Sequence, residues 1–204
     1  MRIPFLLLGI SLLQLGPEDP PQYTFGTTVI DSSGLEGRIY DIKPGTFSLP
    51  KLNKKQPLST IYSHNLNITP RRFDHGFPGI PERIEWFAIE YTGRFWIDYD
   101  GDYSFTLLSD DGSKLFLDNK LVIDNDGIHP PIAVKGWATL SRGIHDIRVG
   151  YFQGPRFDVA LMLWVTPPGE RTKLFDTQDF RPPAEASEWT PGKISNIRAG
   201  RNRF

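Results

Sequence analysis

The chain has 204 residues and a formal net charge of −1 at pH 7, and 39% of its residues are hydrophobic, including 14 Phe, 7 Tyr and 5 Trp. This length allows one domain with extra terminal segments, and the near-neutral charge argues against nucleic acid as a partner. Cysteine is absent, which excludes disulfides and thiolate metal sites, while 19 Gly and 18 Pro favour turns over long helices.

The first 33 residues read as a leader and a spacer. An apolar run over residues 4–15 follows Arg2; it is too short to span a bilayer comfortably and is similar to a secretory signal. Residues 17–22 are rich in proline and acid. We therefore expect a secreted, periplasmic or cell-surface protein with no transmembrane span in the mature chain. A buried strand or a wrongly assigned start remains the alternative.

The middle of the chain has the two-residue periodicity of antiparallel strands. Apolar side chains alternate over residues 95–99 and 103–107 on either side of Asp100-Gly101, which predicts a hairpin. Residues 114–117 and 120–123 flank Asp118-Asn119, for which we expect a two-residue turn with positive φ angles. Residues 159–165 are apolar on both faces, which is typical of a central strand.

Further strands are predicted around residues 34–42, 85–91, 132–140 and 144–151. Their short, regular spacing predicts an all-β fold, an antiparallel, jelly-roll-like β-sandwich over residues 34–168. Residues 46–66 read as a loop, with a short helix as the alternative, and the lysines at 51, 54 and 55 read as a solvated face. Residues 169–204 read as a flexible, partly disordered C-terminal tail, or as a docking peptide for an envelope protein partner.

Asp110 and Asp111 are adjacent and are followed by Gly112. Two neighbouring carboxylates repel each other unless something compensates, and a hard cation bound by oxygen ligands would do so. In a chain without cysteine this indicates Ca²⁺ rather than zinc or copper. The alternative is a hairpin turn in which the carboxylates cap backbone amides.

The order of four segments, 34–40, 101–105, 109–119 and 145–152, resembles the protective-antigen-type domain, a β-sandwich shared by yeast flocculins, bacterial adhesins and some glycosidases. The Ser-Asp-Asp-Gly-Ser run is its most specific part. The resemblance implies a lectin-like, calcium-dependent carbohydrate-binding site in which Asp110 and Asp111, joined by a cis peptide, hold the ion. It also implies ligands from a second loop at residues 153–158, where Gln153, Gly154 and Asp158 are the candidates.

Three further residues are candidates for ligand or metal support. Asn125 and Asp126 lie in a neighbouring polar run that also fits plain turn chemistry. Trp137 follows Gly136 and is a candidate for stacking on a sugar, although most aromatic side chains of a sandwich belong to the core.

No catalytic set is visible in the sequence, so we expect no enzyme activity. Adjacent carboxylates do not face each other across a glycosidic bond, and no G-x-S-x-G, H-x-x-x-H or phosphate-loop motif occurs. The expected function is an exported adhesion module for glycans or cell-surface carbohydrate. The alternatives are a structural or protein-interaction domain with a calcium brace or no ion, and an accessory domain of an envelope assembly.

Overall fold

The computed structural model describes residues 34–72, 85–155, 158–183 and 190–200. The predicted leader and spacer lie outside these residues. Nothing helical in the described part has the length and apolar character needed to cross a membrane. The described strands are β1 (Leu35–Asp41), β2 (Ser59–Ser63), β3 (Asn67–Arg72), β4 (Phe87–Ile97), β5 (Gly101–Asp110), β6 (Ser113–Leu117), β7 (Lys120–Asn125), β8 (Ile132–Leu140), β9 (Gly143–Gln153), β10 (Asp158–Thr166), β11 (Lys173–Leu174) and β12 (Ile194–Ala199).

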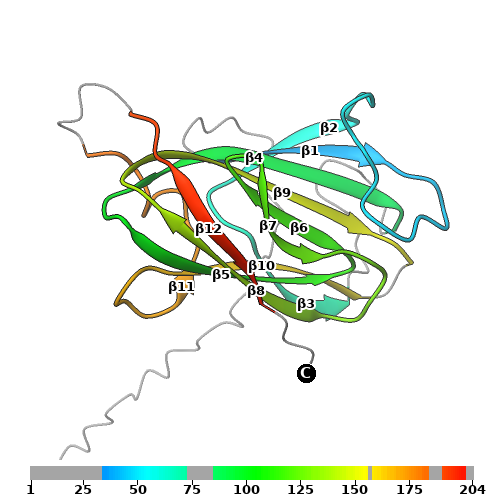
Figure 1. The fold of residues 1–204 in the computed structure, drawn as a ribbon. Helices are drawn as coiled ribbons and strands as arrows, with labels where there is room; N and C mark the ends of the chain where they lie inside the picture. The colour runs from blue at the N-terminus through cyan, green and yellow to red at the C-terminus, as the bar shows by residue number, and fades with distance from the viewer. Residues whose placement is uncertain (1–33, 73–84, 156–157, 184–189, 201–204) are drawn as a thin grey trace, which may run out of the picture.

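The strands form two antiparallel sheets packed face to face (Figure 1). The first sheet has the order β2-β1-β4-β9-β6-β7, and the second has the order β11-β10-β5-β8-β12, with β3 also paired to β10. The predicted all-β antiparallel sandwich is thus confirmed. Because consecutive strands β5 and β6 belong to different sheets, the short turn between them lies at the rim where the two layers meet.

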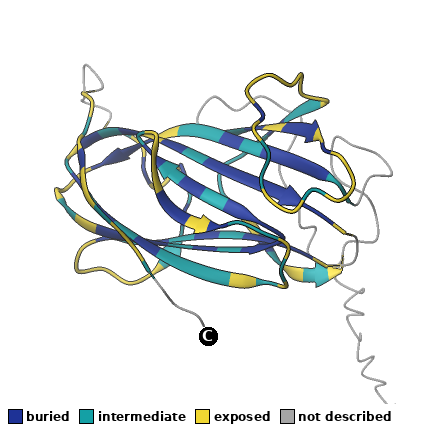
Figure 2. Ribbon diagram, turned by 45° about the vertical axis from the view of Figure 1, so that its right-hand side comes forward, coloured by how far each residue is buried: buried dark blue, intermediate teal, exposed yellow. Residues whose placement is uncertain are grey.

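Alternating side chains of both sheets fill the space between them. Figure 2 colours the buried residues of the strands dark blue. On β5 the inward side chains are Tyr103, Phe105 and Leu107. The neighbouring strand of the same sheet, β10, contributes Leu161 and Leu163. Strand β10 pairs with β5 on one side and with β3 and β11 on the other, which fits its apolar sequence. At the β6–β7 turn Asp118 and Asn119 have φ angles of 46° and 63°, which confirms the expected turn geometry.

A second apolar cluster lies on the outer face of the first sheet. Its buried members Tyr40, Ala88 and Phe152 alternate with core residues along β1, β4 and β9, so they point away from the sandwich interior. Leu52, from the link between β1 and β2, covers them. The prediction of a loop for all of residues 46–66 was wrong at β2, because pairing with β1 supplies the hydrogen bonds that this short segment cannot specify alone.

Two segments of the predicted C-terminal tail are strands. β11 pairs with β10, and β12 pairs with β8 at the edge of the second sheet. The sequence prediction failed here because β11 has two residues and β12 contains a register shift, with Asn196 at a φ of 47°, so neither shows a clear alternation. Edge pairing with an existing sheet determines both elements.

Candidate functional site

Asp110 and Asp111 lie at the rim of the sandwich, in the turn between β5 and β6. Their side chains are only 7% and 4% exposed, respectively, although both are acidic. The peptide bond between them is cis, as the resemblance implied. The main-chain N–H of Phe152 donates to the carbonyl of Gly112 at 2.9 Å, which fixes the turn against β9.

The Asp111 carboxylate joins three segments that are distant in the sequence. Its Oδ1 accepts a hydrogen bond from the backbone N–H of His129 at 3.1 Å, and its Oδ2 accepts one from the backbone N–H of Gly154 at 2.8 Å. Burial raises the pKa of Asp111, while these two N–H donors and the nearby His129 act to lower it. Asp111 thus holds the 124–131 loop and the start of the 153–158 loop beside the aspartate pair.

The Asp110 carboxylate differs from that of Asp111, because no hydrogen-bond donor from the described part of the chain reaches it. Burial, followed by the negative charges of Asp111 and Asp158, raises the pKa of Asp110 to about 7, while His129 acts in the opposite direction. The ionised pair is therefore unfavourable in the protein alone, and a cation beside it would reverse that preference.

A buried hydrogen-bond network through Tyr151 and Gln153 supports the backbone of the aspartate pair. The hydroxyl of Tyr151 donates toward the Asp110 carbonyl at 2.8 Å and also contacts Oε1 of Gln153. The side-chain amide of Gln153 donates to the carbonyl of Pro155 at 3.3 Å and to that of Asp158 at 3.0 Å. The side chain of Gln153 therefore shapes the second loop, and its polar atoms are committed to protein partners.

Asn125 and Asp126 are both near the rim, yet their side chains have different surroundings. Asn125 is buried, and its Nδ2 donates to Ser109 Oγ at 3.0 Å and to the Ile132 carbonyl at 2.9 Å; its Oδ1 receives no hydrogen bond from the described residues. The Asp126 carboxylate instead accepts from the N–H of Leu49 at 2.7 Å and of Gly127 at 3.0 Å.

Lys114 completes the environment of Asp126, with its ammonium 3.1 Å from Oδ2. Asp126 consequently fastens the β1–β2 link to the 124–131 loop. Asn125 Oδ1 accepts no hydrogen bond from the described residues, whereas both Asp126 oxygens have partners in the protein.

Trp137 does not belong to this rim. On β8 it lies opposite Ser104 of β5, whereas Ile132 lies opposite Ser109, next to Asp110. Five residues of strand separate Trp137 from Ile132, about 17 Å. Its ring is near Lys135, whose ammonium is 5.3 Å from the ring centroid. The sequence grouped Trp137 with the polar loops because it could not show how far along β8 the residue lies.

The described rim has features that the sequence did not indicate. Ile128 is 40% exposed, and its Cγ1 lies 3.5 Å from the position that a Cβ on Gly154 would occupy. The same Cβ would lie 3.0 Å from Asp111 Oδ2, so only glycine leaves this space open. An exposed aliphatic side chain thus borders the acidic pair. The sequence did not indicate Ile128, because a single apolar residue in a polar loop forms no periodic pattern.

The residues present fit a hard cation bound by oxygen. Two buried carboxylates lie together, and one of them receives no hydrogen bond from the described residues. Asn125 contacts Ser109, the residue before the pair, through its Nδ2. No group of three or more His, Cys, Asp or Glu side chains suited to a metal occurs among the residues that the structure describes. Further ligands would therefore be carbonyl, amide, water or ligand oxygens, a set that Ca²⁺ accepts.

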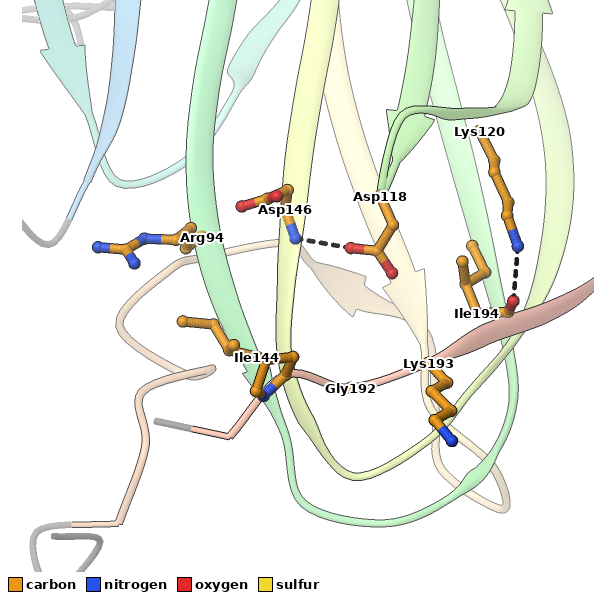
Figure 3. A pocket seen from close by; sticks show the side chains of 9 residues that line it. Arg94, Asp118, Lys120, Ile144, Asp146, Gly192, Lys193 and Ile194 are labelled. Atoms are coloured by element: carbon orange, nitrogen blue, oxygen red, sulfur yellow. Dashed lines mark hydrogen bonds between the residues drawn. The ribbon is translucent and has the colours of Figure 1, made fainter. Parts of the chain in front are cut away.

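A second recess lies at the other end of β6, about 20 Å from the aspartate pair by strand length. It has a volume of about 620 Å³ (Figure 3). Asp118 accepts from the N–H of Asp146 at 2.9 Å and pairs with His145 at 2.8 Å, and Lys120 donates to the Ile194 carbonyl at 2.8 Å. The Asp118 contacts hold the β6–β7 turn against β9, and the Lys120 contact holds the start of β12, so these two side chains have a structural role.

The chain matches the family model of the PA14 domain over residues 31–176. One similar solved structure is the PA14 sugar-binding domain from RTX adhesin, with a TM-score of 0.58 and 19% identity over 71% of this chain and 96% of that chain. A second is the PA14 domain of MpAFP Antifreeze protein, with a TM-score of 0.58 and 15% identity over 80% of this chain and 94% of that one.

A third is an anti-sigma factor domain-containing protein from Clostridium clariflavum, with a TM-score of 0.56 and 20% identity over 82% of this chain and 53% of the other. No curated protein matches the chain in sequence. At these identities the solved structures establish the fold alone. The family model, however, covers well over half of the 204 residues, and this chain therefore belongs to the PA14 domain family.

Proposed function

We propose that this protein is a calcium-dependent carbohydrate-binding or adhesion module with its site at Asp110 and Asp111. The observation that carries the proposal is the buried Asp110 carboxylate, which lacks a hydrogen-bond donor from the described residues and whose pKa is raised to about 7. A cation supplies the missing positive charge, and a site at an exposed rim leaves one side of that cation for a ligand.

In this proposal Asp110 and Asp111 hold Ca²⁺, and Asn125 Oδ1 and the loop that begins at Gly154 supply supporting oxygens. Bound calcium would act as a Lewis acid that accepts sugar hydroxyl oxygens in its coordination shell. Gln153 contributes by shaping the loop, and Asp158 contributes negative charge near Asp110. A similar solved structure is described as a sugar-binding PA14 domain from an adhesin, which supports this class of ligand.

Binding without catalysis fits the site best. Asp110 and Asp111 are adjacent in the chain, and Asp111 is engaged by two backbone N–H groups. Glycosidases of the usual kind need two carboxyl groups that face each other across the scissile bond, about 5–9.5 Å apart. The proposal therefore assigns no reaction to this rim.

The proposal places the protein outside the cytoplasm, in the periplasm, at the cell surface or in the medium. Extracellular calcium modules bind with dissociation constants of about 10⁻⁴–10⁻³ M, which suits millimolar calcium. An apolar run at residues 4–15, similar to a secretory signal, supports the same location.

The test is titration calorimetry with Ca²⁺, followed by a glycan array in Ca²⁺ and in EDTA. The variants Asp110→Asn and Asp111→Asn should each lose calcium binding, whereas Asp179→Asn, in a surface pair with Lys173, should keep it. Calcium binding that persists in both site variants would exclude this site. A calcium-dependent rise in melting temperature with no glycan bound would instead support a structural calcium brace.

A further inference from the structure

The link between β1 and β2 is the most basic exposed segment of the described chain. Residues 43–58 contain four lysines and no acidic residue, in a protein whose formal net charge is −1. All four lysines are exposed. In Figure 1 the link leaves the sheets at the right of the view, and Figure 2 colours much of it as exposed. The basic residues are Lys43, Lys51, Lys54 and Lys55.

This link has a defined shape although it has no regular secondary structure. Leu52 is buried in the outer apolar cluster, and Leu49 packs into the notch at Gly150, where a Cβ would lie 2.4 Å from Leu49 Cδ2. The N–H of Leu49 donates to Asp126, and that of Leu58 donates to the Ile39 carbonyl at 2.7 Å. Contacts with the sandwich therefore fix how the link is presented.

The same contacts leave two large apolar side chains in solvent. Phe47 is 75% exposed and Leu58 is 54% exposed, whereas Leu49 and Leu52 of the same link are packed against the sandwich. Exposed apolar side chains next to a basic cluster are unfavourable in water but suit the boundary between lipid headgroups and acyl chains. A soluble polyanion would attract the lysines but offers no apolar region for Phe47, whereas an anionic bilayer offers both.

We propose that residues 43–58 dock on an anionic phospholipid surface, with the lysines at the headgroups and Phe47 and Leu58 in the interfacial region. This inference goes beyond the proposed function, because it requires neither calcium nor a sugar. The hydrogen bond from the Leu49 N–H to the Asp126 carboxylate keeps residues 43–58 beside the 124–131 loop. A docked molecule thus holds its aspartate rim near the membrane, where glycan headgroups are displayed.

The first experiment is co-sedimentation of the protein with vesicles of phosphatidylcholine containing phosphatidylglycerol, in EDTA and without glycolipid. We expect binding to these vesicles, weaker binding as salt rises, and none to pure phosphatidylcholine. Lys54→Gln should lower the partition coefficient by roughly fivefold. Lys193→Gln, an exposed lysine at the second recess, should leave it unchanged.

The contribution of the exposed apolar side chains is tested by a second variant with its own control. Phe47→Ser should lower partitioning by roughly tenfold, while Tyr99→Ser, at a side chain that is 73% exposed on the β4–β5 turn, should not change it. Phe47→Trp should gain fluorescence that brominated acyl chains quench. Because Phe47 and Tyr99 are mostly solvated, unchanged circular dichroism is expected for all three variants.

Anionic vesicle binding that is equal in wild type, Phe47→Ser and Lys54→Gln would overturn the proposal. Binding to a soluble polyanion such as heparin that is as tight as to vesicles and insensitive to Phe47→Ser would also overturn it, in favour of a simple basic patch. Vesicle binding that appears only with calcium and glycolipid would refute membrane docking by the link while leaving the proposed calcium-dependent site in place.

Discussion

Asp111 Oδ2 accepts a hydrogen bond from the main-chain N–H of Gly154 at 2.8 Å, although the two residues are 43 positions apart in the chain. This bond links the β5–β6 turn to the loop that follows β9. Both sides of the proposed site are therefore held together before any ion binds, and a Cβ at position 154 would lie 3.0 Å from the same carboxylate oxygen.

The first prediction concerns Gly154. In Gly154→Ala the new Cβ lies 3.0 Å from Asp111 Oδ2 and 3.5 Å from Ile128, so the carboxylate must shift. Overpacking of this kind costs about 1–3 kcal/mol, and we expect calcium affinity to fall by at least roughly fivefold. Calorimetry measures this change. Pro155→Ala, at the exposed neighbour, is the control, and equal affinities in the two variants would show that the glycine is not needed.

The second prediction is a pH dependence of calcium binding. The pKa of Asp110 is about 7, so below that pH a proton occupies the carboxylate and competes with the ion. Calcium affinity should be nearly constant above pH 8 and should fall by about tenfold per unit below pH 6. Titrations at pH 5.5, 6.5 and 8 measure the slope, and a constant affinity over this range would contradict the assignment of Asp110 as a ligand.

The third prediction concerns stability without calcium. Folding raises the pKa of Asp110 from 3.8 to about 7, so the folded state binds the proton more tightly than the unfolded state. The stability contributed by this proton is fully present below pH 4 and is lost as pH rises through 7. Asp110→Asn removes the dependence. In EDTA the variant should exceed wild type in unfolding free energy by up to about 4 kcal/mol at pH 8 and by little at pH 4.

Urea denaturation of both proteins at the two pH values measures this difference. If the difference in unfolding free energy between variant and wild type were the same at pH 4 and pH 8, Asp110 would not titrate as described. Saturating calcium at pH 8 should stabilise wild type and leave Asp110→Asn unchanged, because only the wild type retains the site.

The fourth prediction tests whether Gln153 supports the loop or binds calcium directly. Gln153→Leu removes one of the two acceptors of the Tyr151 hydroxyl and the donor for the Pro155 and Asp158 carbonyls, so we expect a loss of about 1–3 kcal/mol in unfolding free energy. Calcium affinity should fall less than in Asp111→Asn, since Asp110 and Asp111 remain. A Gln153→Leu variant with wild-type stability and no calcium binding would instead make Gln153 a direct ligand.

The fifth prediction concerns Asp126. Asp126→Ala leaves the Leu49 N–H without its acceptor and the Lys114 ammonium with Asp124 as its remaining carboxylate partner, and we expect destabilisation of about 1–3 kcal/mol. Hydrogen exchange should increase at Leu49 and Gly127, which lose their acceptor. Asp124→Ala, at a more exposed partner of Lys114, is the control and should cost under about 1 kcal/mol.

The sequence by itself determined the layered β architecture and the aspartate pair. Alternation around Asp100-Gly101 and around Asp118-Asn119 specifies strands and turns locally, because a strand directs successive side chains to opposite faces. The Asp110-Asp111 run identified the candidate site from the sequence alone. Such signals depend only on neighbours in the chain and are therefore readable from it.

Only the tertiary structure decided which other residues meet that pair. Strand register brings Gly154 and His129 to Asp111 and carries Trp137 away from it, and a one-dimensional pattern does not encode register. Likewise β12 exists because β8 offers an unpaired edge. Contacts between distant segments arise from packing and edge pairing, which are properties of the assembled sheets.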